Sequence, residues 1–283
     1  MTGEAVAPRD AATVLLLRGR TDFEIFMVRR SAEAKFMANA MVFPGGRLDD
    51  ADCGDAVAER CALDRAAAAR KLHMEDGGRA LGLLVAAVRE TFEEAGVLLA
   101  RRDGAQLTLD EPSTAARFQA HRDALNAGET SFVAILEAED LVLTVDAVSY
   151  YTRWITPPIE KRRYDARFFM AHAPKGQRPL HDAYETTASQ WLSPASALAA
   201  YDAREIQLAP PTLRILLELA RRRSADEALA LGPPAAPIQP QPLLEDGLLH
   251  LLLPGDPQFD PPGSAPNRVT LRDGHWHTQG RGA

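Results

Sequence analysis

The segment from Ala86 to Val97 places four charged residues within a stretch that is otherwise mostly small and apolar. If this segment is helical, Glu90, Glu93 and Glu94 fall at positions i, i+3 and i+4, so their carboxylates share one face. Apolar residues at core spacing fall on the opposite side, namely Leu81, Leu84, Val88, Phe92 and Ala95. Repelling carboxylates destabilise a helix unless a cation lies among them, and hard oxygen ligands suit Mg²⁺ or Mn²⁺. The segment is therefore a candidate cation site built on a helix.

A solvated glutamate face on a surface helix is the simpler interpretation of this pattern, and two features argue against it. Arg89 lies four residues before Glu93, where its guanidinium can pair with that carboxylate and orient it. Gly96 stands where a C-terminal helix cap is expected, which places the acidic cluster in the last turns. Because the helix macrodipole disfavours negative charge there, we interpret the cluster as functional.

The segment from Arg89 to Val97 resembles the second half of the Nudix box, the sequence motif of the Nudix hydrolases. That box reads Gly, five residues, Glu, seven residues, Arg-Glu, an aliphatic, any residue, Glu-Glu, any residue, Gly and an aliphatic. Phe43-Pro44-Gly45-Gly46 resembles the approach to the first half, with Gly46 as the box glycine. Counting back eight residues from Arg89 reaches Leu81, where the box has its first glutamate. We therefore expect a box split by an insertion of about 30 residues, roughly Leu48 to Arg79.

The split box is similar to that of the coenzyme A diphosphatase branch of the Nudix hydrolases, as are the segments around Trp154 and Arg167. This resemblance implies an α/β fold, a Nudix α/β/α sandwich around a mixed sheet, with a helical insertion and a C-terminal extension. It implies Glu93 and Glu94 as the principal Mg²⁺ or Mn²⁺ ligands, with Glu90 as a further ligand. By the same resemblance Arg89 orients Glu93, and Gly45 and Gly46 lend backbone to the site.

For the reaction, the resemblance implies hydrolysis of coenzyme A or acyl-coenzyme A to 3′,5′-ADP and (acyl-)phosphopantetheine. The residues themselves indicate only a diphosphate linked to another group, so ADP-ribose, NADH and nucleotide sugars stay open as substrates. The displaced first glutamate leaves a second possibility of another class, a Nudix fold kept as a non-catalytic ligand sensor.

Further candidates for the site come from three segments. Asp49, Asp50 or Asp52 can replace the displaced glutamate, although a plain acidic loop is the simpler interpretation. Arg163 and Arg167 can bind phosphates through bidentate contacts, or can lie on the polar face of an edge strand. By resemblance, Glu185 is a candidate metal ligand or general base from a loop before the last strand.

Composition limits the possible partners and the compartment. The formal net charge of −7 argues against nucleic-acid binding, which requires basic surface, but permits a small phosphate-bearing substrate. The longest apolar runs are too short to span a membrane. Cys53 and Cys61 are expected as free thiols, and we expect a cytoplasmic protein, with a homodimer left open.

Residues 1–222 are predicted to form the Nudix domain, and residues 223–283 a proline-rich linker with a strand-like extension. Within the first, Ala11–Arg18 and Phe23–Arg30 read as a strand hairpin, and Ala56–Leu72 as one alanine-rich helix. Within the second, Gly247–Leu253 and Arg268–His277 read as strands that dock on the main sheet.

Overall fold

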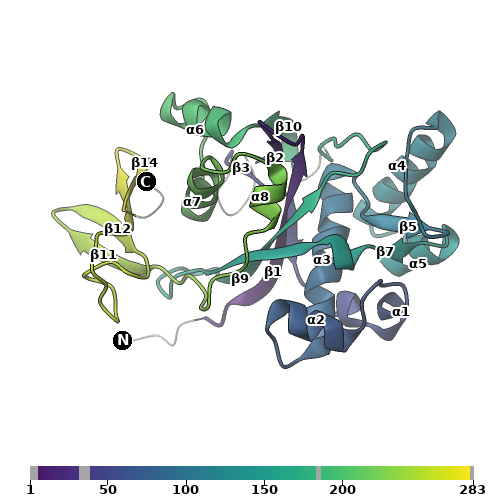
Figure 1. The fold of residues 1–283 in the computed structure, drawn as a ribbon, viewed down its shortest axis with the longest axis horizontal. Coiled ribbons are helices and arrows are strands. Elements are labelled where there is room, and N and C mark those ends of the chain that lie inside the picture. Colours follow the sequence, from purple (N-terminus) through teal and green to yellow (C-terminus); the bar gives the residue numbers. More distant parts are fainter. Residues whose placement is uncertain (1–5, 32–38, 183–185, 281–283) are drawn as a thin grey trace.

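A mixed sheet of seven strands forms the centre of the computed structural model, which describes residues 6–31, 39–182 and 186–280 (Figure 1). Its main path runs β10-β2-β1-β9-β8, with β3 paired to β2 and β4 paired to β1. Strands β1 and β9 are parallel, and the other pairs are antiparallel. The strands are β1 Arg9–Arg18, β2 Glu24–Arg30, β3 Met41–Val42, β4 Gly45–Arg47, β8 Ser149–Ile155, β9 Tyr164–His172 and β10 Thr186–Leu192. The predicted hairpin is confirmed as the β1–β2 pair.

Side chains of the central strands alternate between two hydrophobic cores, one on each face of the sheet. In β1, Val14 and Leu16 belong to one core, whereas Leu15 and Leu17 belong to the other. The long helix α3 (Gly77–Ala95) covers the first face. Helices α6 (Pro194–Asp202), α7 (Pro210–Leu219) and α8 (Ala225–Leu229) cover the second. The prediction of an α/β/α sandwich around a mixed sheet is confirmed.

Helix α3 begins and ends at the residues that its sequence favours. The side chain of Asp76 accepts a hydrogen bond from Arg79 N in the first turn, as an N-cap does. Gly96 ends the helix with φ 67°, a left-handed conformation that glycine adopts without a Cβ penalty. The predicted cap at Gly96 is confirmed, so Glu93 and Glu94 lie in the last turn.

The inserted segment is helical, but it is not the single helix that we predicted over Ala56–Leu72. It forms a 3₁₀ turn η1 (Asp50–Cys53) and the helices α1 (Asp55–Ala58) and α2 (Arg65–Leu72). The break has two causes. The Asp64 side chain caps α2 by accepting from Ala67 N, and the backbone of residues 60 and 62 pairs with Leu143.

A second group of elements packs beside the C-terminal end of α3. It holds two helices, a small three-stranded sheet and a 3₁₀ turn: α4 Pro112–Asn126, α5 Phe132–Ala138, β5 Ala100–Arg102, β6 Ala105–Gln106, β7 Val142–Leu143 and η2 Val145–Ala147. Phe118 of α4 and Phe132 of α5 join the core under α3. This group therefore forms a wall next to the acidic cluster.

The C-terminal strands form their own sheet and do not add to the main sheet, although Leu251, Leu253 and Val269 join the core on its second face. They pair in the order β11-β12-β13-β14: β11 Gln241–Glu245, β12 Leu248–Leu252, β13 Arg268–Arg272 and β14 His275–Gln279. They rest on α6, where the Tyr201 hydroxyl accepts from Trp276 N at 2.7 Å and donates to Trp276 O at 3.0 Å. Asp256 is fully buried beneath them and binds the Arg268 guanidinium. Sequence periodicity identified these strands but carried no information on their partners.

None of the helices in the described parts of the chain is long and apolar enough to cross a membrane.

Candidate active site

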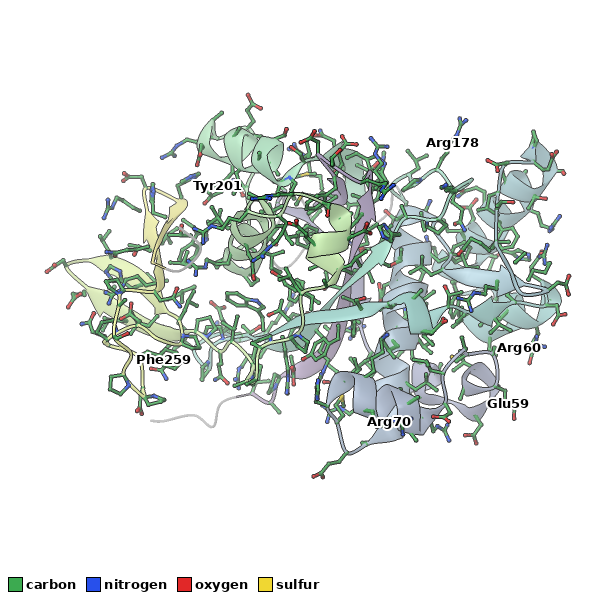
Figure 2. The ribbon with its side chains drawn as sticks, in the orientation of Figure 1. Glu59, Arg60, Arg70, Arg178, Tyr201 and Phe259 are labelled. Carbon is green, nitrogen blue, oxygen red and sulfur yellow. The ribbon has the colours of Figure 1, made fainter. Side chains whose placement is uncertain are left out.

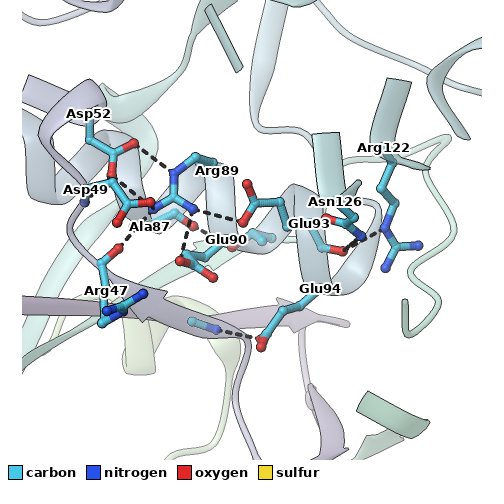
Figure 3. Close-up of polar contacts among 12 residues, drawn as sticks. Arg47, Asp49, Asp52, Ala87, Arg89, Glu90, Glu93, Glu94, Arg122 and Asn126 are labelled. Atoms are coloured by element: carbon cyan, nitrogen blue, oxygen red, sulfur yellow. Dashed lines mark hydrogen bonds and ion pairs between the residues drawn. The ribbon is translucent and has the colours of Figure 1, made fainter. Parts of the chain in front are cut away.

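A single arginine, Arg89, lies at the centre of the candidate site (Figure 3). It is 7 % exposed, and its Nη1 donates to Glu90 Oε1 at 3.0 Å and to Glu93 Oε2 at 2.8 Å. Its Nε donates to Asp52 Oδ1 at 2.8 Å, and its Nη2 donates to Asp52 Oδ2 at 3.0 Å. Nη2 also donates to the carbonyl of Arg47 at 2.9 Å. Burial alone lowers the pKa of Arg89, but these carboxylates outweigh that effect and raise it.

Asp52 is the residue of the candidate site for which the sequence was least informative. It is 3 % exposed at the end of the turn η1, so the expectation of a plain acidic loop is wrong for this residue. Its carboxylate accepts two parallel hydrogen bonds from Arg89, although the two residues are 37 positions apart in the chain. A signal was present in the sequence, because five residues follow Gly46, as in the box, and the next residue is Asp52. Counted this way, the inserted residues follow Asp52.

The two glycines before the insertion bring backbone into direct contact with the acidic helix. Gly45 N donates a hydrogen bond of 2.8 Å to Glu94 Oε2. Gly46 lies so close to Glu90 that a Cβ added there would stand 2.3 Å from Glu90 Oε1. Only glycine permits this approach without displacing the carboxylate. Strand β4 is therefore one wall of the site.

The environment of Glu93 differs from that of an ordinary surface glutamate. Burial raises its pKa, and the nearby charges of Asp52 and Asp49 act in the same direction. Arg89 lowers the pKa through its charge and its hydrogen bond, but does not cancel the shift. The ionised form of such a carboxylate is destabilised by its surroundings, and a bound cation would stabilise it.

The acidic face offers the donor atoms that a hard divalent cation prefers. Glu90, Glu93 and Glu94 lie on neighbouring positions of one helix, and each presents two carboxylate oxygens. One oxygen of each already accepts from Arg89 or from Gly45 N. In the described part of the chain, no three acidic, His or Cys side chains are already arranged around one point to hold a metal ion. The chemistry of this set of donor atoms fits Mg²⁺ or Mn²⁺.

Comparison with known proteins identifies the family of this chain. The family model described as NUDT19 Nudix domain matches residues 7–221. The chain belongs to this family. The chain shares 28 % identity over 323 residues with the acyl-coenzyme A diphosphatase NUDT19 of Gallus gallus, covering 93 % of this chain and 83 % of that protein. The Homo sapiens protein of the same name is 29 % identical over 272 residues, covering 83 % of this chain and 72 % of its own length.

A solved structure supports the same assignment. The crystal structure of a NUDIX hydrolase from Alicyclobacillus acidocaldarius aligns with a TM-score of 0.63 and 26 % identity. The alignment covers 82 % of this chain and 99 % of that one. The resemblance drawn from the split box is therefore confirmed, and the chain is a Nudix hydrolase.

Both predicted phosphate-binding arginines already bind oxygen atoms of the protein. Arg163 is 8 % exposed, and it donates to the carbonyls of Thr156 at 3.0 Å and Val6 at 2.7 Å. Arg167 is 3 % exposed and pairs with Asp10 and Asp165. Phosphate binding by this pair stays a prediction. Glu185, the predicted base, lies outside the described residues.

Sequence analysis also missed Arg122, which binds the C-terminal end of the acidic helix. This arginine of α4 is 2 % exposed, and its Nε donates to the carbonyl of Glu93 at 2.8 Å. Asn126 Nδ2 lies 3.4 Å from the same carbonyl. Figure 3 shows Arg122 beyond Glu93 and Glu94, at the end of α3 opposite to Asp52. Its role follows from the packing of α4 against α3, which no local pattern in the sequence indicates.

Proposed function

We propose that this Nudix hydrolase cleaves the diphosphate linkage of coenzyme A or acyl-coenzyme A. The products are 3′,5′-ADP and phosphopantetheine or its acyl derivative. The observation that carries the proposal is the buried Arg89 cluster, because it holds Glu90 and Glu93 beside Gly46 despite the split box. The substrate class comes from relatives whose names describe them as acyl-coenzyme A diphosphatases.

In this proposal Glu90, Glu93 and Glu94 hold Mg²⁺ or Mn²⁺. Such a cation, when bound, neutralises charge on a diphosphate and lowers the pKa of water. The chain itself supplies orientation: Arg89 fixes the side chains of Glu90 and Glu93, and Gly45 N fixes Glu94. Asp52 holds Arg89 in place and so acts as a positioning residue. Glu185 stays our candidate for the base that removes a proton from the attacking water.

The proposal also includes a cytoplasmic location and a small-molecule substrate in place of a nucleic acid or membrane partner. Cys53 and Cys61 are both free, as expected in a reducing compartment. Whether the protein is a homodimer is a question for light scattering.

Product analysis tests the substrate and separates the remaining alternatives. The protein is incubated with Mg²⁺ or Mn²⁺ and, separately, coenzyme A, an acyl-coenzyme A, ADP-ribose, NADH and a nucleotide sugar, and products are resolved by chromatography. We expect 3′,5′-ADP from the two coenzyme A substrates at a higher kcat/KM than for the others. Cleavage of ADP-ribose, NADH or the sugar alone would reject coenzyme A as the substrate. Binding of these compounds without cleavage of any would instead identify a ligand sensor.

A further inference from the structure

A cavity of about 340 Å³ lies next to the C-terminal end of α3, on the side away from Asp52. Its apolar lining includes Phe92 of α3 and Phe118 of α4. Two arginines also line it, Arg122 from α4 and Arg178 from the segment that precedes β10. Asp110 is the one acidic side chain among the described residues of the lining, and the charges of Asp182, Asp123 and Glu94 also act on Arg122.

Arg122 is a buried cation whose hydrogen bonds are incomplete. Its Nη2 atom is buried and has no hydrogen-bond partner among the described residues, although Nε donates to the carbonyl of Glu93. Burial lowers the pKa of Arg122, and the neighbouring charges of Asp182, Asp123 and Glu94 offset that effect only in part. A buried guanidinium with an unpaired nitrogen is unfavourable unless a ligand completes its bonding.

The wall of the cavity is held in a fixed position by hydrogen bonds. Leu180 N donates to the carbonyl of Ala95 at 3.0 Å, and Leu109 N donates to the carbonyl of Gly176 at 2.8 Å. Gln177 is 8 % exposed, and its Nε2 donates to the carbonyls of Leu98 and Leu107 at 3.0 Å each. Arg178, the next residue, is thereby positioned at the cavity while its own side chain reaches solvent (Figure 2).

We propose that this cavity is a subsite for a phosphate group of the substrate, bound by Arg122 and Arg178. The subsite rests on the proposed function, and its ligand is then the 3′-phosphate of coenzyme A. That phosphate is separated from the diphosphate by three carbons and two oxygens. Arg122 contacts the backbone of Glu93, the residue whose carboxylate faces the proposed reaction centre. The proposed subsite and the acidic face therefore meet at Glu93, as a substrate with two closely spaced phosphate groups requires.

A pair of nucleotides that differ only in the 3′-phosphate tests the subsite directly. Binding of 3′,5′-ADP and of 5′-AMP is measured by calorimetry in EDTA, so that no metal contributes. The wild-type protein is expected to bind 3′,5′-ADP about tenfold or more tightly, as charge-assisted hydrogen bonds to one phosphate provide. Equal binding of the two nucleotides by the wild type would overturn the proposal.

Two variants assign that preference to the cavity. Arg178→Gln removes an exposed charge and is expected to lower the preference for 3′,5′-ADP about threefold or more. Arg122→Lys keeps the charge but loses the guanidinium fork, and is expected to lower it further. Arg70→Gln removes an exposed charge on α2, far from Arg178 in Figure 2. It is the matched control and is expected to keep the wild-type preference. A preference unchanged in Arg178→Gln and in a folded Arg122→Lys would overturn the assignment.

The hydrolysis assay separates this inference from the proposed function. Hydrolysis of coenzyme A without any preference for 3′,5′-ADP would reject the subsite and leave the function intact. A clear preference without hydrolysis would support the subsite and reject the catalytic function.

Discussion

Two buried arginines flank the last turns of α3, and they differ in how completely the protein satisfies them. Arg89 is engaged by Asp52, Glu90, Glu93 and the carbonyl of Arg47. Arg122 is buried still more deeply, yet it binds the carbonyl of Glu93 and leaves Nη2 unpaired. A saturated arginine fixes geometry, whereas an unsaturated one retains bonding capacity for a ligand. We therefore assign Arg89 to the framework of the site and propose Arg122 for binding of the substrate.

Replacement of Glu93 by Gln is expected to give the largest effect, and it tests the carboxylates that Arg89 orients. The change keeps the shape of the side chain but removes the charge that we assign to cation binding, so kcat is expected to fall ~10³-fold or more. Steady-state kinetics on coenzyme A measures the effect. Glu59→Gln, an exposed carboxylate of the inserted segment, is the control and is expected to keep wild-type kcat. A Glu93→Gln enzyme with near-normal turnover would contradict the assignment.

Removal of the charge on Asp52 probes the support behind that carboxylate. Asp52→Asn removes the carboxylate that binds two nitrogens of the buried Arg89, and we expect the free energy of unfolding to fall by about 3 kcal/mol. A kcat/KM reduced by about tenfold or more should accompany this change, because Glu93 loses its orientation. Chemical denaturation and kinetics measure the two effects, and Asp52→Glu is expected to restore part of both. Wild-type stability in Asp52→Asn would show that the ion pair contributes nothing.

The two arginines also explain how far the sequence alone could lead. The acidic face of α3 and its cap at Gly96 were predictable, because helical spacing and capping are local properties. Asp52 was harder, since the insertion hides its relation to Arg89, and only the forward spacing from Gly46 reveals it. The position of Arg122 and the pairing of the C-terminal strands depend on which elements pack together. No short pattern in a single sequence reveals such packing.

Lysine substitution at both positions sharpens the comparison. Arg89→Lys loses the fork that binds both oxygens of Asp52, so we expect a loss of about 2 kcal/mol in the free energy of unfolding. Arg122→Lys removes one hydrogen bond to the protein, that of Nε to Glu93 O, and is expected to cost about 1 kcal/mol. Denaturant titration of the two proteins gives both values. A larger loss at Arg122 than at Arg89 would reverse our ranking.

The pH dependence of stability gives the smallest expected effect and concerns the anchor of α4. Burial raises the pKa of Glu139, but hydrogen bonds from Arg117, His121 and Arg102 outweigh it and lower the pKa from 4.5 to about 2. The native state thus holds this carboxylate ionised where the unfolded chain binds a proton. Its contribution to stability is present above pH 4.5 and is lost as the pH falls toward 2.

Unfolding free energies measured between pH 5 and pH 2 check this anchor. The Glu139→Gln variant is expected to lose less stability over that range than the wild type, because it has no such carboxylate to protonate. Glu137→Gln, an exposed position on α5, serves as the control. An unfolding free energy that changes equally with pH in Glu139→Gln and in the wild type would contradict this role of Glu139.

The dependence of coenzyme A turnover on a divalent cation is the most direct test of the central claim. Release of 3′,5′-ADP is followed with protein treated with EDTA, then with Mg²⁺ or Mn²⁺ restored, for the wild type and Glu93→Gln. We predict no release in EDTA, recovery with either cation in the wild type, and no recovery in Glu93→Gln. Release in EDTA as fast as with the cation would contradict a role of the α3 carboxylates in holding a catalytic metal.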